Sequence, residues 1–155
     1  MALNLDKLKA EAKQIDEQKL SDEAKKIKLL ELSAKHKKDL INLFENSFSG
    51  ESVIQENGGN EFSVLFGEIK ISMYMVTLRP AEKNGILLPS NTVDPIFSKT
   101  KSGKKVIAIQ LLDVTNYMEL SENSNEYRYR YRLNEENKEC KFADIESILQ
   151  LIVEA

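Results

Sequence analysis

Several residue types on which enzymes and extracellular proteins depend are scarce in this chain. Its 155 residues include one cysteine, one histidine and no tryptophan. With a single thiol, Cys140, no internal disulfide can form and a four-cysteine zinc site is excluded. A second histidine for a metal pair or a proton relay is also missing. We therefore expect a cytoplasmic protein that uses no metal or other cofactor.

Long apolar runs and a strong net charge are missing as well. No run of about 18 apolar residues occurs, which argues against a membrane span, and charged residues appear too early for a signal peptide. The formal net charge is −3, whereas a dedicated duplex-DNA binder is usually strongly basic. The sequence therefore predicts no membrane partner and leaves room only for a local basic surface.

The residues that are present predict a single globular domain. The apolar share of 41% and the length suit one hydrophobic core. Within residues 1–155 we expect a helical N-terminal segment over 1–48, a β-rich body over 51–133 and a closing helix over 143–155.

Two amphipathic helices are predicted in the first third of the chain. Apolar residues recur at spacings of three and four, which predicts a helix over residues 3–18. Ser21 and Asp22 offer side-chain oxygens that can cap a new helix N-terminus. A broad apolar stripe then predicts a second helix over residues 22–44, and Gly50 is suited to stop it.

Beyond residue 50 the hydrophobic period changes to two, which is typical of strands. Asn and Gly residues predict a turn inside a β-hairpin over residues 52–66. Residues 68–79 are predicted to form a longer strand, which we expect to be central and covered by helices. Residues 80–104 contain all three prolines and are predicted to be a loop, with a short strand near residues 86–88.

The last third of the chain alternates between strand and turn patterns before it becomes helical. Strands are predicted over residues 105–114 and 127–133, a polar turn over 134–138, and a helix from about residue 143. The predicted fold class is α+β: two N-terminal amphipathic helices, then a mainly antiparallel sheet of about five strands and a C-terminal helix.

The first candidate for ligand chemistry is a run in which tyrosines and arginines alternate. In a strand, alternate side chains point to opposite faces, so one face would be aromatic and the other cationic. Tyrosines can stack on bases, and arginines can contact phosphates or carboxylates. In a structural alternative, an outer strand buries its tyrosines and solvates its arginines. The candidate residues are Tyr127, Arg128, Tyr129, Arg130, Tyr131 and Arg132.

A second candidate is a short basic segment with four lysines: Lys99, Lys101, Lys104 and Lys105. It predicts a loop that contacts an anion such as a nucleic-acid backbone, or alternatively a solvated hairpin tip. The segment does not match a phosphate-binding loop, because Ser98 occupies a position that requires glycine and Lys105 one that requires serine or threonine. Nucleotide hydrolysis is therefore not expected.

Glu68 and Lys70 form a third candidate, since residues two apart on a strand share a face. The pair resembles the Glu-x-Lys element of restriction-type nucleases, which would imply a carboxylate that holds Mg²⁺ and a lysine that steadies a phosphate. Those nucleases also need an upstream aspartate at a strand end. The nearest upstream aspartate, Asp39, falls inside a predicted helix, and Glu56 and Glu61 are imperfect substitutes.

The single histidine and the single cysteine are expected to have no catalytic role. His36 lies among lysines on a charged helix, so we predict a solvent-exposed side chain. Cys140 has no obvious base beside it, and a buried or incidental thiol is predicted.

Three functions remain after these exclusions. The sequence favours a non-catalytic protein that binds an anionic partner, with single-stranded nucleic acid or a nucleoprotein as the best-motivated case. The alternative is a protein–protein interaction module (an adaptor, an inhibitor or an assembly component) that contacts another protein or itself through residues 1–48. A metal-dependent nuclease is the remote alternative. The lysine- and asparagine-rich composition would suit a phage or mobile-element accessory protein.

Overall fold

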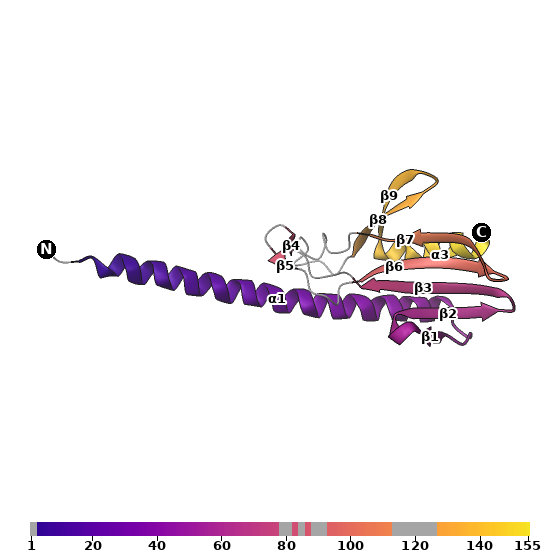
Figure 1. Ribbon diagram of the computed structural model, residues 1–155, viewed down its shortest axis with the longest axis horizontal. Helices are drawn as coiled ribbons and strands as arrows, with labels where there is room; N and C mark the ends of the chain where they lie inside the picture. Colours follow the sequence, from indigo (N-terminus) through magenta and orange to yellow (C-terminus); the bar gives the residue numbers. More distant parts are fainter. Residues whose placement is uncertain (1–2, 78–81, 84–85, 88–92, 113–126) are drawn as a thin grey trace.

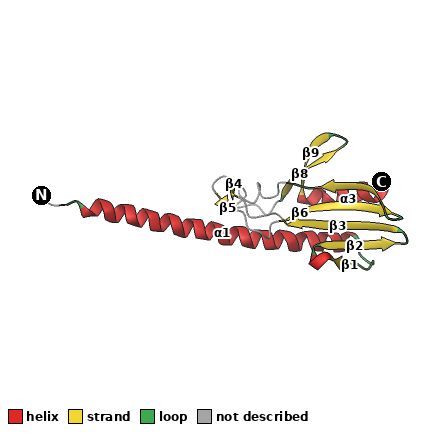
Figure 2. Ribbon diagram, viewed as in Figure 1, coloured by secondary structure: helices red, strands yellow, loops and turns green. Residues whose placement is uncertain are grey.

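The computed structural model describes residues 3–77, 82–83, 86–87, 93–112 and 127–155. Its main parts are a long helix α1 (Leu5–Ser47), an antiparallel sheet of five strands and a short helix α3 (Ile145–Glu154). The sheet and α3 form a body, from which α1 projects with the N-terminus at its tip (Figure 1). In Figure 2 the inner end of α1 and the whole of α3 overlap the strands of the sheet, whereas the outer part of α1 extends away from them. The predicted α+β class is confirmed.

The two predicted N-terminal helices are one continuous helix. α1 runs for 43 residues through the expected break at Ser21 and Asp22, a length of roughly 65 Å at 1.5 Å per residue. Instead of capping a new helix, Asp22 accepts a hydrogen bond of 3.0 Å from the Gln18 side chain one turn earlier. Serine and aspartate each cost well under 1 kcal/mol inside a helix, and neither glycine nor proline is present to break it. α1 ends at Ser47, close to the predicted stop at Gly50.

The main sheet is entirely antiparallel, in the order β1-β2-β3-β6-β7. The predicted hairpin is confirmed, because β1 and β2 pair across a turn that includes η1 (Asn57–Gly59). β3 is the middle strand, as expected. The strands are β1 (Ile54–Glu56), β2 (Glu61–Phe66), β3 (Ile69–Thr77), β6 (Val93–Lys101) and β7 (Lys104–Gln110).

One face of this sheet carries the hydrophobic core. Met73 pairs with Phe97, which pairs with Ile109, and all three side chains are buried. The inner end of α1 and the whole of α3 lie behind this face (Figure 1). In the described part of the chain the opposite face has no helix over it, so the expectation that helices cover the central strand holds for one face only.

β6 lies where the sequence predicted a loop. Residues 93–101 form a nine-residue strand between β3 and β7. The side chains that face the core come from alternate residues of this strand. Two of them are Pro95 and Lys99 rather than apolar strand formers, so the sequence shows no apolar alternation here. Proline is tolerated in this strand because only its carbonyl is needed here, where it accepts a 2.9 Å hydrogen bond from the Leu111 N–H.

Two further strand pairs complete the described structure. The short strand expected near residues 86–88 is β5 (Ile86–Leu87), which pairs with β4 (Glu82–Lys83). β8 (Arg128–Leu133) confirms the predicted tyrosine–arginine strand. Its partner β9 (Glu136–Lys141) occupies most of the predicted polar turn and was missed, because almost all of its side chains are exposed and show no apolar alternation.

The C-terminal helix closes the core as predicted. After the turn η2 (Phe142–Asp144), α3 places Ile145, Ile148, Leu149 and Ile152 against the sheet. Neither helix in the described residues combines the length and apolar content that a membrane span requires. From α1, the buried apolar residues are Leu40 and Phe44.

Candidate functional site

The tyrosine–arginine strand divides its side chains between the core and solvent. Tyr129 is fully buried, Tyr127 is nearly so and Tyr131 is half-buried. Arg128, Arg130 and Arg132 are exposed on the other face. The alternation of faces is therefore as predicted, but the burial of Tyr127 and Tyr129 leaves neither ring open to a base.

His36 is the residue that fixes these tyrosines against α1. Its ring is fully buried, so the prediction of a solvent-exposed histidine is wrong. A hydrogen bond of 2.5 Å joins its Nε2 to the Tyr129 hydroxyl, and its ring centroid lies 4.7 Å from that of Tyr127. Burial lowers the pKa of His36 from 6.5 to about 3, so the imidazole is neutral at pH 7. Its Nδ1 has no hydrogen-bond partner among the described residues.

Asp39 holds the second tyrosine of the same contact. The Tyr127 hydroxyl donates a 3.1 Å hydrogen bond to the Asp39 carboxylate, whose other neighbour is the Lys35 ammonium at 3.8 Å. Burial, the Asp39 charge and this hydrogen bond all raise the pKa of Tyr127. We call His36, Asp39, Tyr127 and Tyr129 the polar contact between α1 and β8.

Sequence reasoning missed this polar contact, although one signal pointed to it. His36 lies four residues before Leu40 and eight before Phe44, which places it on the core-facing side of the helix. The neighbouring lysines concealed that position, because Lys35 and Lys38 point to solvent from other faces of α1. The contact is best explained as structural, because the imidazole of His36 is buried against the rings of Tyr127 and Tyr129.

The four candidate lysines do not act as one group. Lys99 lies in β6, is largely buried and donates hydrogen bonds to the carbonyl oxygens of Val153 and Ala155, at 2.8 and 2.5 Å. It thereby satisfies carbonyl groups at the C-terminal end of α3. Lys101, Lys104 and Lys105 are exposed around a tight hairpin turn. The hairpin-tip alternative therefore describes their placement.

The exposed lysines and the arginine row also lie far apart. Leu112, just beyond the end of β7, pairs with Arg130, whereas Lys104 begins β7. Eight residues of extended chain separate Lys104 from Leu112, a distance of roughly 25 Å. The two basic groups therefore stand at opposite ends of β7 and form no single continuous surface.

Glu68 and Lys70, the pair that resembles a nuclease element, contact different partners. The Lys70 ammonium lies 3.5 Å from a carboxylate oxygen of both Glu56 and Glu61, and Glu68 accepts a 2.5 Å hydrogen bond from the Ser102 hydroxyl. Lys70 and Glu61 help to line a shallow groove of about 610 Å³ on the open face of the sheet. In the described residues no three acidic, histidine or cysteine side chains are placed to hold a metal ion.

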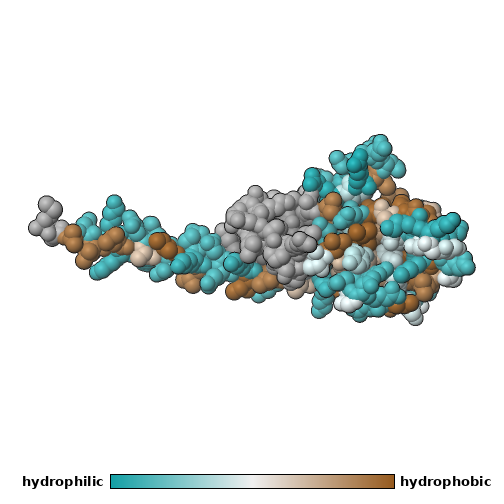
Figure 3. All heavy atoms as spheres, viewed as in Figure 1, coloured by the Kyte–Doolittle hydropathy of each residue, from teal (hydrophilic) through white to brown (hydrophobic). Residues whose placement is uncertain are grey.

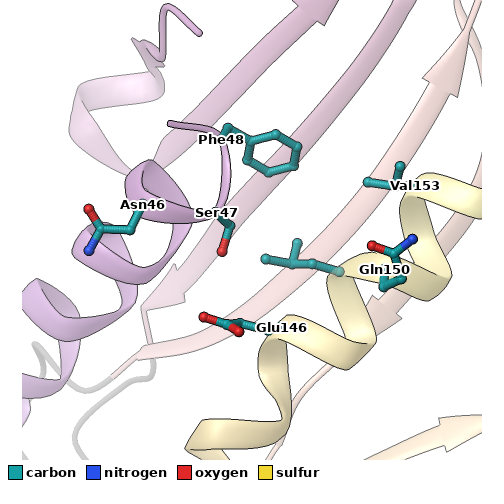
Figure 4. A pocket seen from close by; sticks show the side chains of 7 residues that line it. Asn46, Ser47, Phe48, Glu146, Gln150 and Val153 are labelled. Atoms are coloured by element: carbon teal, nitrogen blue, oxygen red, sulfur yellow. The ribbon is translucent and has the colours of Figure 1, made fainter. Parts of the chain in front are cut away.

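A second groove, of about 350 Å³, lies between the end of α1 and α3. Figure 4 shows Ser47 and Phe48 on one side, and Glu146, Gln150 and Val153 on the other. No candidate residue from the sequence lines it. Cys140 is buried elsewhere, and burial raises the pKa of its thiol to about 11, so little thiolate forms at neutral pH.

The projecting part of α1 is the surface whose exposure is hardest to explain by the body alone. We call residues 5–30 the arm. Large apolar side chains along it are between 47% and 67% exposed, and brown and teal side chains mix along its visible side (Figure 3). These exposed residues are Leu5, Leu8, Ile15, Leu20, Ile27 and Leu30.

Charge is balanced along the same arm. Residues 5–30 contain seven lysines and six acidic residues, so the arm has no strong field of one sign. An apolar stripe with mixed charges beside it is typical of a helix that packs on another helix. Comparison with known proteins adds no relative: no family model, no curated protein and no solved structure matches the chain.

Proposed function

We propose that the protein is a non-catalytic protein-interaction module whose docking element is the arm, with the body as the platform that holds it. The observation that carries this proposal is the row of six exposed leucine and isoleucine side chains on a helix that extends beyond the body (Figure 1). Exposed apolar surface that is contiguous along one element marks an interaction site more often than an isolated exposed leucine does.

The energetics of the arm support this proposal. Burial of one leucine or isoleucine side chain contributes about 1.5–3 kcal/mol, and the arm leaves six of them between 47% and 67% exposed. Most helical stability in proteins comes from packing of the apolar face rather than from intrinsic propensity. A partner on that face would therefore stabilise the arm itself as well as the complex.

The chemistry of the arm favours an α-helical partner. A near-neutral surface gains little from the phosphates of a nucleic acid, whose binding depends on lysine and arginine in excess. A second amphipathic helix can bury the stripe and pair with charges of both signs along its edges. We therefore name an amphipathic helix of mixed charge as the partner.

Site-specific photocrosslinking tests the proposal. A photoreactive phenylalanine analogue is placed at Leu8 or Ile15, on the stripe, and at Gln14, an exposed position on the other side of the same helix. The full chain is irradiated alone and in an extract of its own cells. We expect protein adducts from the two stripe positions and far fewer from Gln14. Equal yields at all three positions, or no adduct in either sample, would overturn the proposal.

A second candidate function is contact with an anionic partner through the arginine row. Its support is the exposure of Arg128, Arg130 and Arg132 on one face of β8. Because phosphate contacts release counterions, the affinity for a single-stranded oligonucleotide should fall steeply with salt. The triple alanine variant of the row should lose this binding, whereas alanine at Lys101, Lys104 and Lys105 serves as a control of equal charge. No binding at low salt rejects this candidate.

A further inference from the structure

We propose that the partner of the arm is the arm of a second copy, packed antiparallel with a two-fold axis near Ser21. This inference rests on the proposed function, because it names the occupant of the same stripe. It is carried by the order of apolar and charged residues along the described helix. When one of two copies is reversed, residues of opposite charge lie opposite each other, and so do apolar residues.

Charged residues interrupt the stripe at the middle of the arm. The spacing that joins Leu5, Leu8, Ala12 and Ile15 continues to Lys19 and then to Asp22, both exposed. In a parallel pair in register, each of these residues would meet its own copy, so lysine would face lysine and aspartate would face aspartate. Like charges at the centre of a helix pair are destabilising, and polar residues at such positions commonly set orientation.

Reversal of one arm about Ser21 turns these repulsions into attractions. Lys19 and Glu23 lie two residues on either side of Ser21, so each would stand opposite the other in the partner copy. Asp16 and Lys26, five residues on either side, would likewise be opposed. Two independent pairs of opposite charge are thereby formed, and each occurs twice across the axis.

The apolar residues follow the same symmetry. Ile15 and Ile27 both lie six residues from Ser21, and Ala12 and Leu30 both lie nine residues from it. The pairing thus sets isoleucine against isoleucine and a small residue against a large one, which lets two helices interdigitate.

Outside residues 15–27, the pairing of residues about Ser21 does not favour the antiparallel arrangement. Lys7 and Lys35 are equidistant from Ser21, and so are Glu11 and Glu31, which would oppose like charges. The antiparallel preference therefore comes from residues 15–27, where the stripe contains its charged interruption. The overlap of the two arms would extend over about residues 12–30, because Ser33 and His36 are already buried in the body.

Distances between spin labels on the full chain test this arrangement. Single cysteines replace Lys9 or Gln14, both exposed, in a Cys140→Ser background, and the oligomeric state is measured by sedimentation. In the antiparallel pair the labelled Lys9 positions are about 36 Å apart along the helix axis and the Gln14 positions about 21 Å apart. In a parallel pair both distances approach the helix spacing of roughly 10 Å.

A charge reversal provides a second measurement. Lys19→Glu sets two acidic residues together twice in each antiparallel pair, so we expect the dissociation constant of the dimer to rise about tenfold. Adding Glu23→Lys should restore it, whereas in a parallel pair the double variant keeps like charges opposed. The matched control is Glu17→Lys, a charge reversal at an exposed position on the side of α1 away from the stripe.

The outcomes separate this inference from the proposed function. A dimer in which the Lys9 labels are about 36 Å apart and the Gln14 labels about 21 Å apart supports antiparallel pairing. A dimer with two short distances, or a chain that stays monomeric at about 100 µM, overturns it. If the photocrosslinks at Leu8 and Ile15 then lead to another protein, the proposed function stands and only its self-pairing fails.

Discussion

The two halves of α1 have similar amphipathic patterns and opposite surroundings. In the inner half, Leu40 and Phe44 are fully buried against the sheet, together with Ser33 and His36. In the arm, six leucine and isoleucine side chains are between 47% and 67% exposed. An apolar stripe therefore indicates that a helix face is covered. The stripe does not indicate whether the same chain or another one covers that face.

The halves should therefore respond differently to concentration. Contacts of the inner half are made within one chain, so their contribution to stability is independent of concentration. If the arm is covered by a partner, its contribution follows mass action and disappears on dilution. Substitutions in each half, measured in dilute solution, test this distinction.

The largest effect is expected at Phe44, at the centre of the inner half. Phe44→Ala removes a fully buried ring and should lower the free energy of unfolding by about 3–5 kcal/mol, through lost burial and the cavity that remains. Urea unfolding followed by far-ultraviolet circular dichroism measures the change. Phe66→Ala, at an exposed phenylalanine of β2, is the matched control and should cost less than about 1 kcal/mol. Equal losses would mean that the inner half is not packed as described.

Acid should weaken the inner half next. Because the pKa of His36 falls from 6.5 to about 3 on folding, the unfolded chain binds more protons between these values. Stability is therefore complete above about pH 7 and is lost as the pH falls towards 3, by roughly 4 kcal/mol from this group alone. Urea unfolding at pH 7, 6, 5 and 4 measures the slope.

The variant His36→Gln isolates this effect from the titration of carboxylates. The glutamine amide can still reach the Tyr129 hydroxyl but does not titrate. Subtraction of its pH profile from that of the parent should leave a slope confined to the range below pH 6.5. Identical profiles would show that His36 is not buried in the neutral form.

A smaller loss is expected when the polar contact between α1 and β8 loses one hydroxyl. Tyr129→Phe removes the only hydrogen bond of the His36 imidazole among the described residues, which should cost about 1–3 kcal/mol. Tyr131→Phe, on the same strand at a half-buried position, should change stability by less than about 0.5 kcal/mol. Thermal unfolding of both variants at pH 7 compares them, and a larger loss for Tyr131→Phe contradicts the described contact.

Sequence patterns predicted the elements whose burial is periodic. β3 buries the alternate apolar residues Ile71, Met73 and Met75, and α3 buries one helical face, so their patterns were read correctly. β6 was missed because two of its inward residues are Pro95 and Lys99, and β9 because its surroundings are mostly solvent. In both cases the partner strand, rather than local composition, determines the structure.

Candidate site residues were harder to predict because their partners lie far away in the chain. The burial of His36 depends on Tyr129, 93 residues later, and that of Lys99 on carbonyl groups more than 50 residues later. Local sequence shows a histidine among lysines and a lysine in a basic segment, which are patterns typical of surfaces. The exposed stripe of the arm is different, since its pattern was visible from the sequence while its lack of a cover was not.

The smallest effect on the folded chain itself is expected in the arm, and it provides the sharpest contrast with Phe44. In dilute, monomeric solution, Leu8→Ala removes a side chain that is 59% exposed, and alanine is at least as good a helix former. The free energy of unfolding of the body should therefore change by less than about 0.5 kcal/mol. At concentrations where the arms are paired, the same substitution should lower the melting temperature, because burial against the partner is lost. A loss above about 2 kcal/mol in dilute solution would mean instead that the arm packs on its own body, and the two halves of α1 would then no longer differ.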